Sequence, residues 1–207
     1  DSQQWDKSLD AYAKRAAMGG WAEEVFYSIF RCAMIKMIKG DNWPDAQDTL
    51  LQAWNVRPHR AEPLHHLAKV HRMNGNPHLG YLFSHQAMNI AYPEHDILFI
   101  SDDIYKWQIL DEFASTAFYV GDIERGHKAC VRLLELCGSG DIPEEHHERI
   151  KTNFTFYDNA MKEKMEQGAA ILEEVRKKKE DQEKKMKNMK NKKRKNKNKN
   201  KKRKARV

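Results

Sequence analysis

The sequence lacks most of the features that mark enzymes, secreted proteins and membrane proteins. Its 207 residues contain no run of 18 apolar residues, which excludes a membrane-spanning helix from this sequence. Three cysteines without a CxxC pair argue against a disulfide framework or a zinc site and indicate a reducing, cytoplasmic location. No glycine-rich phosphate loop, GxSxG or HExxH is found, so the common motifs for phosphate binding, serine hydrolysis and zinc proteolysis are missing.

Charge is distributed very unevenly along the chain. Residues 176–207 carry 19 Lys and Arg side chains against three acids, whereas the other 175 residues carry 18 basic and 27 acidic groups. The net charge of +7 therefore describes neither part, since one carries +16 and the other −9. With 40% hydrophobic residues the chain can bury a core, but the basic segment has too few apolar side chains to fold alone.

Three stretches share the spacing of a repeated helical hairpin. In each, an Ala lies seven positions before a Gly that is followed by Asp or Asn, and a second helical segment comes next. A small residue lets paired helices approach closely, and the Gly ends the first helix in the left-handed conformation. A helix, turn and helix of about 34 residues is typical of a tetratricopeptide repeat. The Ala/Gly pairs are Ala33/Gly40, Ala68/Gly75 and Ala114/Gly121.

We therefore predict an all-α fold of tetratricopeptide-like hairpins (an α-solenoid) with a basic C-terminal tail that is disordered or helical. The repeat domain spans residues 1–160, followed by a charged helix at 161–190 and a disordered Lys/Arg/Asn-rich tail at 191–207. Residues 5–18 resemble the second helix of a hairpin, so we expect the domain to start within a repeat and the chain to be a fragment. The predicted hairpins are 22–39/44–56, 61–74/78–91 and 104–119/123–137, with a capping helix at 143–160.

An insertion of about eleven residues interrupts the repeat spacing between Pro93 and Trp107. Its apolar run 97–100 precedes Asp102 and Asp103, which resemble the carboxylates that hold Mn²⁺ or Mg²⁺ at a strand end. Because no second strand is evident, the favoured interpretation is that 97–100 fill an apolar gap while the aspartates begin the next helix. Asp102 and Asp103 stay weak metal candidates, and we expect no catalytic residue and no cofactor in this chain.

The inner face of such a stack would be lined by the first helix of each hairpin. Stacked helix pairs form an extended concave surface that suits a peptide or another domain. The alternatives are a groove that is merely solvated, or one filled by the chain's own C-terminal helix. The predicted groove residues are Glu62, His65, Lys69, Arg72, Gln108, Asp111, Ser115 and Phe118.

Aromatic residues recur at helical spacing along the body. This pattern favours a packed core over an exposed stacking platform. The aromatic residues assigned to the core are Trp21, Phe26, Tyr27, Phe30, Trp43, Trp54, Tyr81, Phe83, Trp107, Phe113, Phe118 and Tyr119.

The tail carries two compact basic clusters. They match nuclear-import patches and suit any phosphate-rich surface, so a nuclear location is the alternative to a cytoplasmic one. No aromatic residue is interleaved with them, so binding to nucleic acid would ignore sequence and depend on salt. The clusters consist of Lys192, Lys193, Arg194 and Lys195, and of Lys201, Lys202, Arg203 and Lys204.

Several short motifs resemble a known family. The segments 11–26 (AYAKRAAMGGWAEEVF), 57–64 (RPHRAEPL), 98–107 and 111–134 are similar, in this order, to the region after the catalytic domain in tetratricopeptide-containing family 2 glycosyltransferases of bacteria and large viruses. The resemblance covers residues 5–157. The Lys/Asn-rich tail departs from the bacterial pattern.

That resemblance implies a non-catalytic accessory module, since the family holds its nucleotide-sugar and divalent metal in an upstream domain. We therefore expect a helical-repeat scaffold that contacts a protein or peptide in its groove, or an upstream catalytic domain. The alternative is an adaptor whose basic tail binds a polyanion, either RNA, DNA or an anionic membrane.

Overall fold

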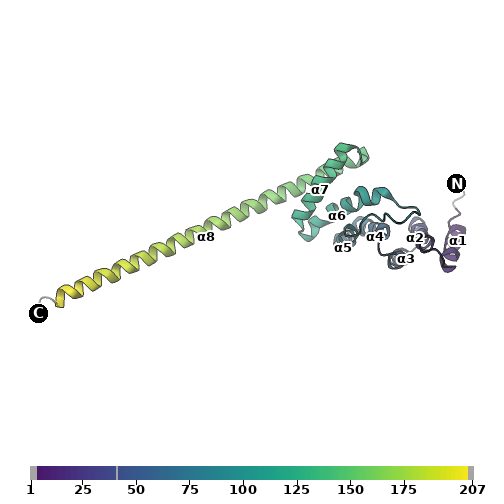
Figure 1. Ribbon diagram of the computed structural model, residues 1–207. Helices are drawn as coiled ribbons and strands as arrows, with labels where there is room; N and C mark the ends of the chain where they lie inside the picture. The colour runs from purple at the N-terminus through teal and green to yellow at the C-terminus, as the bar shows by residue number, and fades with distance from the viewer. Residues whose placement is uncertain (1–3, 41, 205–207) are drawn as a thin grey trace. The chain divides into compact units, whose positions relative to one another are not determined.

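The computed structural model describes residues 4–40 and 42–204, and the described part is helical without any β-strand (Figure 1). The all-α class is therefore confirmed. The elements are, in chain order, α1 (Trp5–Ala17), α2 (Ala22–Lys39), α3 (Trp43–Val56), α4 (Glu62–Met73), α5 (Pro77–Met88), the π-helical turn η1 (Ile104–Gln108), α6 (Ile109–Ala117), the 3-10 turn η2 (Phe118–Val120), α7 (Ile123–Ser139), the 3-10 turn η3 (Glu144–His146) and α8 (His147–Lys204).

Glycine turns end the first helix of each hairpin. Gly75 and Gly121 have φ of +74° and +77°, which confirms the predicted left-handed conformation. Beyond each glycine, a backbone N–H reaches back five residues, from Asn76 to His71 O at 2.9 Å and from Asp122 to Ala117 O at 3.0 Å. These bonds satisfy carbonyl groups that the helix end would otherwise leave unpaired.

Helices that are adjacent in sequence pack against each other through the body, from α1 with α2 to α6 with α7. In addition α4 contacts α6, although α5 lies between them in sequence. The first helices of the second and third predicted hairpins, α4 and α6, therefore lie in contact with each other. Figure 1 shows the order of the helices in the body.

Two clusters of buried side chains form the core. The first joins Phe26, Phe30, Leu50 and Leu67 from α2, α3 and α4. The second joins residues of α6 and α7 to Ile150 and Tyr157 in the first turns of α8. Because one core side chain bridges only neighbouring helices, each cluster stabilises a part of the stack rather than its whole length.

The chain divides into two units, residues 1–159 and 160–207, with the division inside α8. The backbone of α8 is helical to Lys204. No Gly or Pro follows Gly168 within α8, and Lys and Arg are good helix formers. No helix in the described part of the chain is long and apolar enough to cross a membrane.

Candidate interaction surfaces

The predicted groove residues lie on α4, on α6 and at the turns that flank α6, but they differ in exposure. Lys69 and Phe118 are exposed, and Arg72, Gln108 and Ser115 are half-buried. The remaining three, Glu62, His65 and Asp111, are buried. The accessible part of this face is therefore smaller than the sequence predicted.

Two ion pairs cross the face. The guanidinium of Arg72 donates two hydrogen bonds to the Glu112 carboxylate at 2.6 and 3.0 Å. Arg149 of α8 donates two to Asp111 at 2.8 and 2.7 Å. These carboxylates raise the pKa of both arginines, so both guanidinium groups stay charged at any physiological pH.

The first turns of α8 thus cover part of the predicted groove. Besides Arg149, Asn153 donates to Ser115 Oγ at 3.4 Å, and Tyr157 donates to the Ala114 carbonyl at 2.7 Å. This last bond is buried, because the Tyr157 ring occupies the space left by the missing side chain of Gly126. The chain's own C-terminal helix, one of the alternatives left open by the sequence, therefore fills the groove at Asp111 and Ser115.

A hollow of about 210 Å³ remains beside this contact. Three aromatic side chains at its rim are exposed, with Phe118 41%, Tyr119 63% and Phe156 59% accessible. The ring centroid of Phe118 lies 5.5 Å from that of Tyr157 and 6.5 Å from that of Phe156. Ser115 and Asn153 supply a polar edge. We call these six residues the aromatic hollow.

The aromatic hollow corrects one part of the sequence analysis. Phe118 and Tyr119 were assigned to the core, but both side chains are exposed. Both belong to the short turn η2 after α6, which contacts α5 and α6 but leaves these two side chains accessible. Trp21, also assigned to the core, is 44% exposed at the start of α2.

His65 and His66 of α4 are packed together rather than presented to solvent. Their ring centroids are 5.0 Å apart, and His66 also lies 5.5 Å from Phe30. Burial, reinforced by Lys69, lowers the pKa of His66 to about 4, and burial lowers that of His65 well below its usual range. Both imidazoles are therefore neutral at pH 7.

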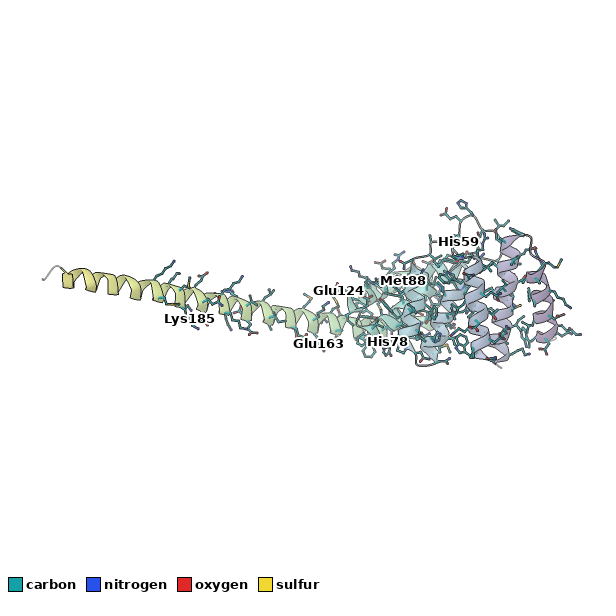
Figure 2. The ribbon with its side chains drawn as sticks, turned by 90° about the horizontal axis from the view of Figure 1, so that it is seen from below. His59, His78, Met88, Glu124, Glu163 and Lys185 are labelled. Atoms are coloured by element: carbon teal, nitrogen blue, oxygen red, sulfur yellow. The ribbon has the colours of Figure 1, made fainter. Side chains whose placement is uncertain are left out.

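The insertion is attached to the body by a buried ionic network. Arg60, 1% exposed, donates to Glu62 at 2.6 Å and to Asp96 at 3.2 Å. Arg57 also donates to Asp96, at 2.8 and 2.5 Å, and His59 Nε2 lies 3.3 Å from its carboxylate. His59 is labelled in Figure 2. Hydrogen bonds from Arg57 hold the pKa of Asp96 well below its usual range.

The same network binds the insertion backbone. The Glu23 carboxylate accepts from the N–H groups of Ile97 and Leu98 at 2.9 and 2.8 Å. Arg60 donates to the carbonyls of Leu98 and Phe99 at 3.3 and 3.2 Å. Polar contacts therefore hold the insertion together with apolar ones: Ile97 and Phe99 are 80% and 63% exposed, but the Phe99 ring stacks on that of Tyr27 with centroids 4.5 Å apart.

The weak metal candidates lie on the helical turn that begins after the insertion. Asp102 and Asp103 are exposed, and Asp102 accepts a hydrogen bond from Tyr92 at 2.8 Å. The segment before them is not a strand. Among the described residues, no group of three His, Cys, Asp or Glu side chains is placed to hold a metal ion.

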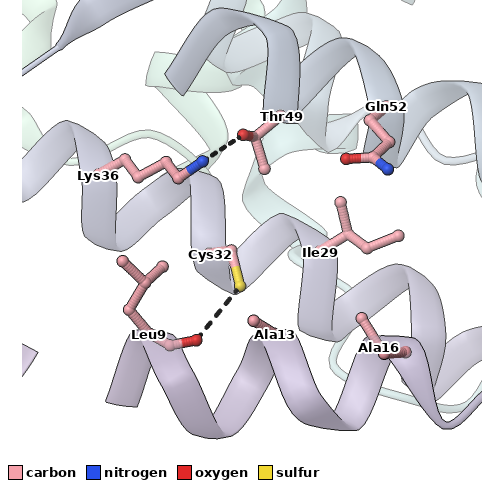
Figure 3. Close-up of a pocket in the computed structure, with 9 residues that line it drawn as sticks. Leu9, Ala13, Ala16, Ile29, Cys32, Lys36, Thr49 and Gln52 are labelled. Atoms are coloured by element: carbon pink, nitrogen blue, oxygen red, sulfur yellow. Dashed lines mark hydrogen bonds between the residues drawn. The ribbon is translucent and has the colours of Figure 1, made fainter. Parts of the chain in front are cut away.

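A hollow of about 540 Å³ lies between α1, α2 and α3 (Figure 3). Its walls are mostly small or apolar, and Lys36 is engaged by Thr49 at 3.0 Å. The Cys32 thiol points to the Leu9 carbonyl at 3.8 Å, and burial raises the pKa of this thiol. A thiol of raised pKa is a poor nucleophile, so this hollow offers no reactive group.

The basic clusters 192–195 and 201–204 lie on the helical backbone of α8. Their side chains are outside the described part of the structure. On a helix, consecutive residues rise 1.5 Å each, so the positive charge is spread along a rod rather than gathered in one pocket.

Comparisons with known proteins assign no family to this chain, so its function is argued from the geometry. No family model matches the chain. No curated protein matches it either.

Sequence reasoning missed three of the residues that shape these surfaces. Asn153 and Phe156 follow the predicted hairpins, in a segment treated only as a cap. Asp96 is the charged centre of the insertion, and the dense charges of residues 57–62 were the signal that could have identified its partners.

Proposed function

We propose that this chain is a non-catalytic, tetratricopeptide-like interaction module. Its binding site is the aromatic hollow, with the exposed part of the face formed by α4 and α6. The observation that carries the proposal is the group of three exposed aromatic rings, Phe118, Tyr119 and Phe156, beside the polar groups of Ser115 and Asn153.

Physical chemistry favours a protein or peptide partner at this place. Contiguous exposed aromatic side chains are uncommon on free surfaces and concentrate at binding sites. The rings sit on rigid helical elements, so little conformational entropy is lost when a partner buries them. The ion pairs of Arg72 and Arg149 keep the floor of the face in one geometry.

Selection of peptides from a random display library on the full chain tests this proposal. We expect selected peptides to bind at least about tenfold more weakly to Phe118→Ala and Phe156→Ala, because a buried aromatic anchor contributes more than 1.4 kcal/mol. Leu82→Ala is the matched control, since Leu82 is 55% exposed on α5 and outside the hollow. Peptides whose affinity ignores both phenylalanines would contradict the proposal.

We propose further that the module serves a family 2 glycosyltransferase. The support is the series of motifs between residues 5 and 157 that resembles the region after the catalytic domain in that family. The nucleotide-sugar and divalent metal would then belong to the catalytic domain. Incubation of the chain with a panel of nucleotide-sugars and Mn²⁺ should release no nucleotide. Turnover by the chain alone would refute a non-catalytic role.

A second candidate function is polyanion binding by the tail. The specific observation is its charge, 19 basic groups against three acids over residues 176–207. For six neutralised phosphates, log affinity for single-stranded RNA of random sequence should fall with log salt at a slope of about −4.

Substitution of the basic residues in 192–195 and 201–204 by Gln should flatten this slope. The matched control replaces the lysines in both clusters by Arg, which retains the charge and should retain the slope. RNA binding that is independent of salt would contradict this second function.

A further inference from the structure

The second unit carries a row of large apolar side chains that are exposed. Every described side chain from 162 to 190 is exposed apart from Gly168, which has none. Leu172 is 71% accessible, and Ile171 next to it is 60% accessible. The large exposed apolar residues of this segment are Met165, Ile171, Leu172, Val175, Met186 and Met189.

Most of these residues follow a heptad. Positions separated alternately by four and three residues form a continuous row along one side of the helix. A strict seven-residue repeat of apolar side chains is the pattern of a left-handed coiled coil. The row is Met161, Met165, Gly168, Leu172, Val175, Lys179, Gln182, Met186 and Met189.

The charged residues occupy the other sides of the helix. Glu174 and Lys178 form an ion pair of 2.5 Å, and Arg176 pairs with Glu180 at 3.2 Å. Pairs four residues apart support an isolated helix by only about 0.3–0.5 kcal/mol each. They keep the backbone helical but leave the apolar row uncovered.

The charge of this segment favours a second copy of the same segment as the partner that covers the apolar row. Residues 161–189 carry nine basic and seven acidic side chains, a net charge of only +2, so repulsion between two copies of this segment is small. Residues 184–204 carry no acid at all, and the apolar row ends among them at Met189. The apolar row therefore lies mainly on a segment of small net charge, which runs into a basic extension. Such a segment can pair with the same segment of a second chain.

We propose that residues 161–189 of α8 pair with the same segment of a second copy of this chain in a coiled coil. Lys179 and Gln182 form two adjacent polar layers in the seam. Polar residues at seam positions set the register of a coiled coil and lower its stability. This dimer does not depend on the aromatic hollow and would bring two such sites together in one assembly.

Sedimentation equilibrium of the full chain between about 1 and 100 µM tests the proposal. We expect twice the mass of a single chain at the upper concentrations. Leu172→Glu with Val175→Glu should weaken the dimer by about 100-fold or more, because two apolar side chains per helix lose their burial. Gln167→Glu with Ala170→Glu is the matched control, since it adds the same charge on the opposite side of the helix.

A substitution that tightens the dimer distinguishes pairing through this seam from a general effect on the stability of the helix. Lys179→Leu with Gln182→Leu completes the apolar row and should tighten the dimer by about tenfold or more. Helix content is followed by circular dichroism in every variant. A chain that stays monomeric throughout this concentration range, or a dimer that responds equally to the seam variant and its control, would overturn the proposal.

Discussion

Arg60 and Asp96 are 36 residues apart in the sequence, yet a buried hydrogen bond of 3.2 Å joins Arg60 Nη1 to Asp96 Oδ2. The bond ties the turn between α3 and α4 to the insertion that precedes α6. Neither side chain is accessible enough to be hydrated, so both depend on charged partners inside the protein, with Glu62 also pairing with Arg60 and Arg57 also pairing with Asp96.

Removal of Asp96 should therefore destabilise the body strongly. Asp96→Ala leaves Arg57 and Arg60 with one fewer carboxylate in a buried setting, and a cost of about 3–5 kcal/mol is expected. Urea unfolding of the full chain measures this change. Asp102→Ala is the control, because Asp102 is exposed and its loss should cost less than about 1 kcal/mol. Equal stabilities of the two variants would mean that the network does not hold the insertion.

The buried histidines should make stability depend on pH. The pKa of His66 is about 4 in the folded chain and about 6.5 when unfolded. The unfolded chain therefore binds the proton first, so this contribution is complete above pH 6.5 and is lost as the pH falls toward 4. In His66→Gln, the urea midpoint of unfolding should vary less with pH between 6.5 and 4. The same change at the exposed His78 should leave the pH dependence as it is.

A side chain at Gly126 should displace α8 from α7. A Cβ placed there would lie 2.3 Å from the Tyr157 ring, far inside van der Waals contact. We expect Gly126→Ala to cost about 1–3 kcal/mol in unfolding free energy. Gly138→Ala, where a Cβ meets nothing within 4 Å, should be neutral or slightly stabilising. A neutral Gly126→Ala would show that the Tyr157 contact is not formed.

The exposed aromatic rings should be dispensable for folding. Phe156→Ala is expected to change the unfolding free energy by less than about 1 kcal/mol, because this ring is 59% accessible. Phe113→Ala, at a ring 1% accessible in the second core cluster, should cost about 3–5 kcal/mol. If Phe156→Ala proved as damaging as Phe113→Ala, the ring would be structural and the aromatic hollow would lose its main support.

Local pattern was enough to locate the helices of the body. The seven-residue spacing from Ala68 to Gly75 and from Ala114 to Gly121 predicted where α4 and the η1–α6–η2 segment end, and both glycines have the expected positive φ. These features depend on residues within one or two helical turns of each other. Sequence alone contains that information, because helix ends are set by local backbone sterics and hydrogen bonding.

The composition of the tail also needed no structure, since a net charge of +16 is a property of the residue list. Contacts between residues far apart in the sequence could not be predicted from local pattern or composition. Glu23 binds the backbone at Ile97, Arg60 binds Asp96, and Arg149 enters the face predicted as an open groove. Each contact brings together groups more than 30 residues apart, and only the packing of the helices decides which charges meet and which aromatic rings stay exposed.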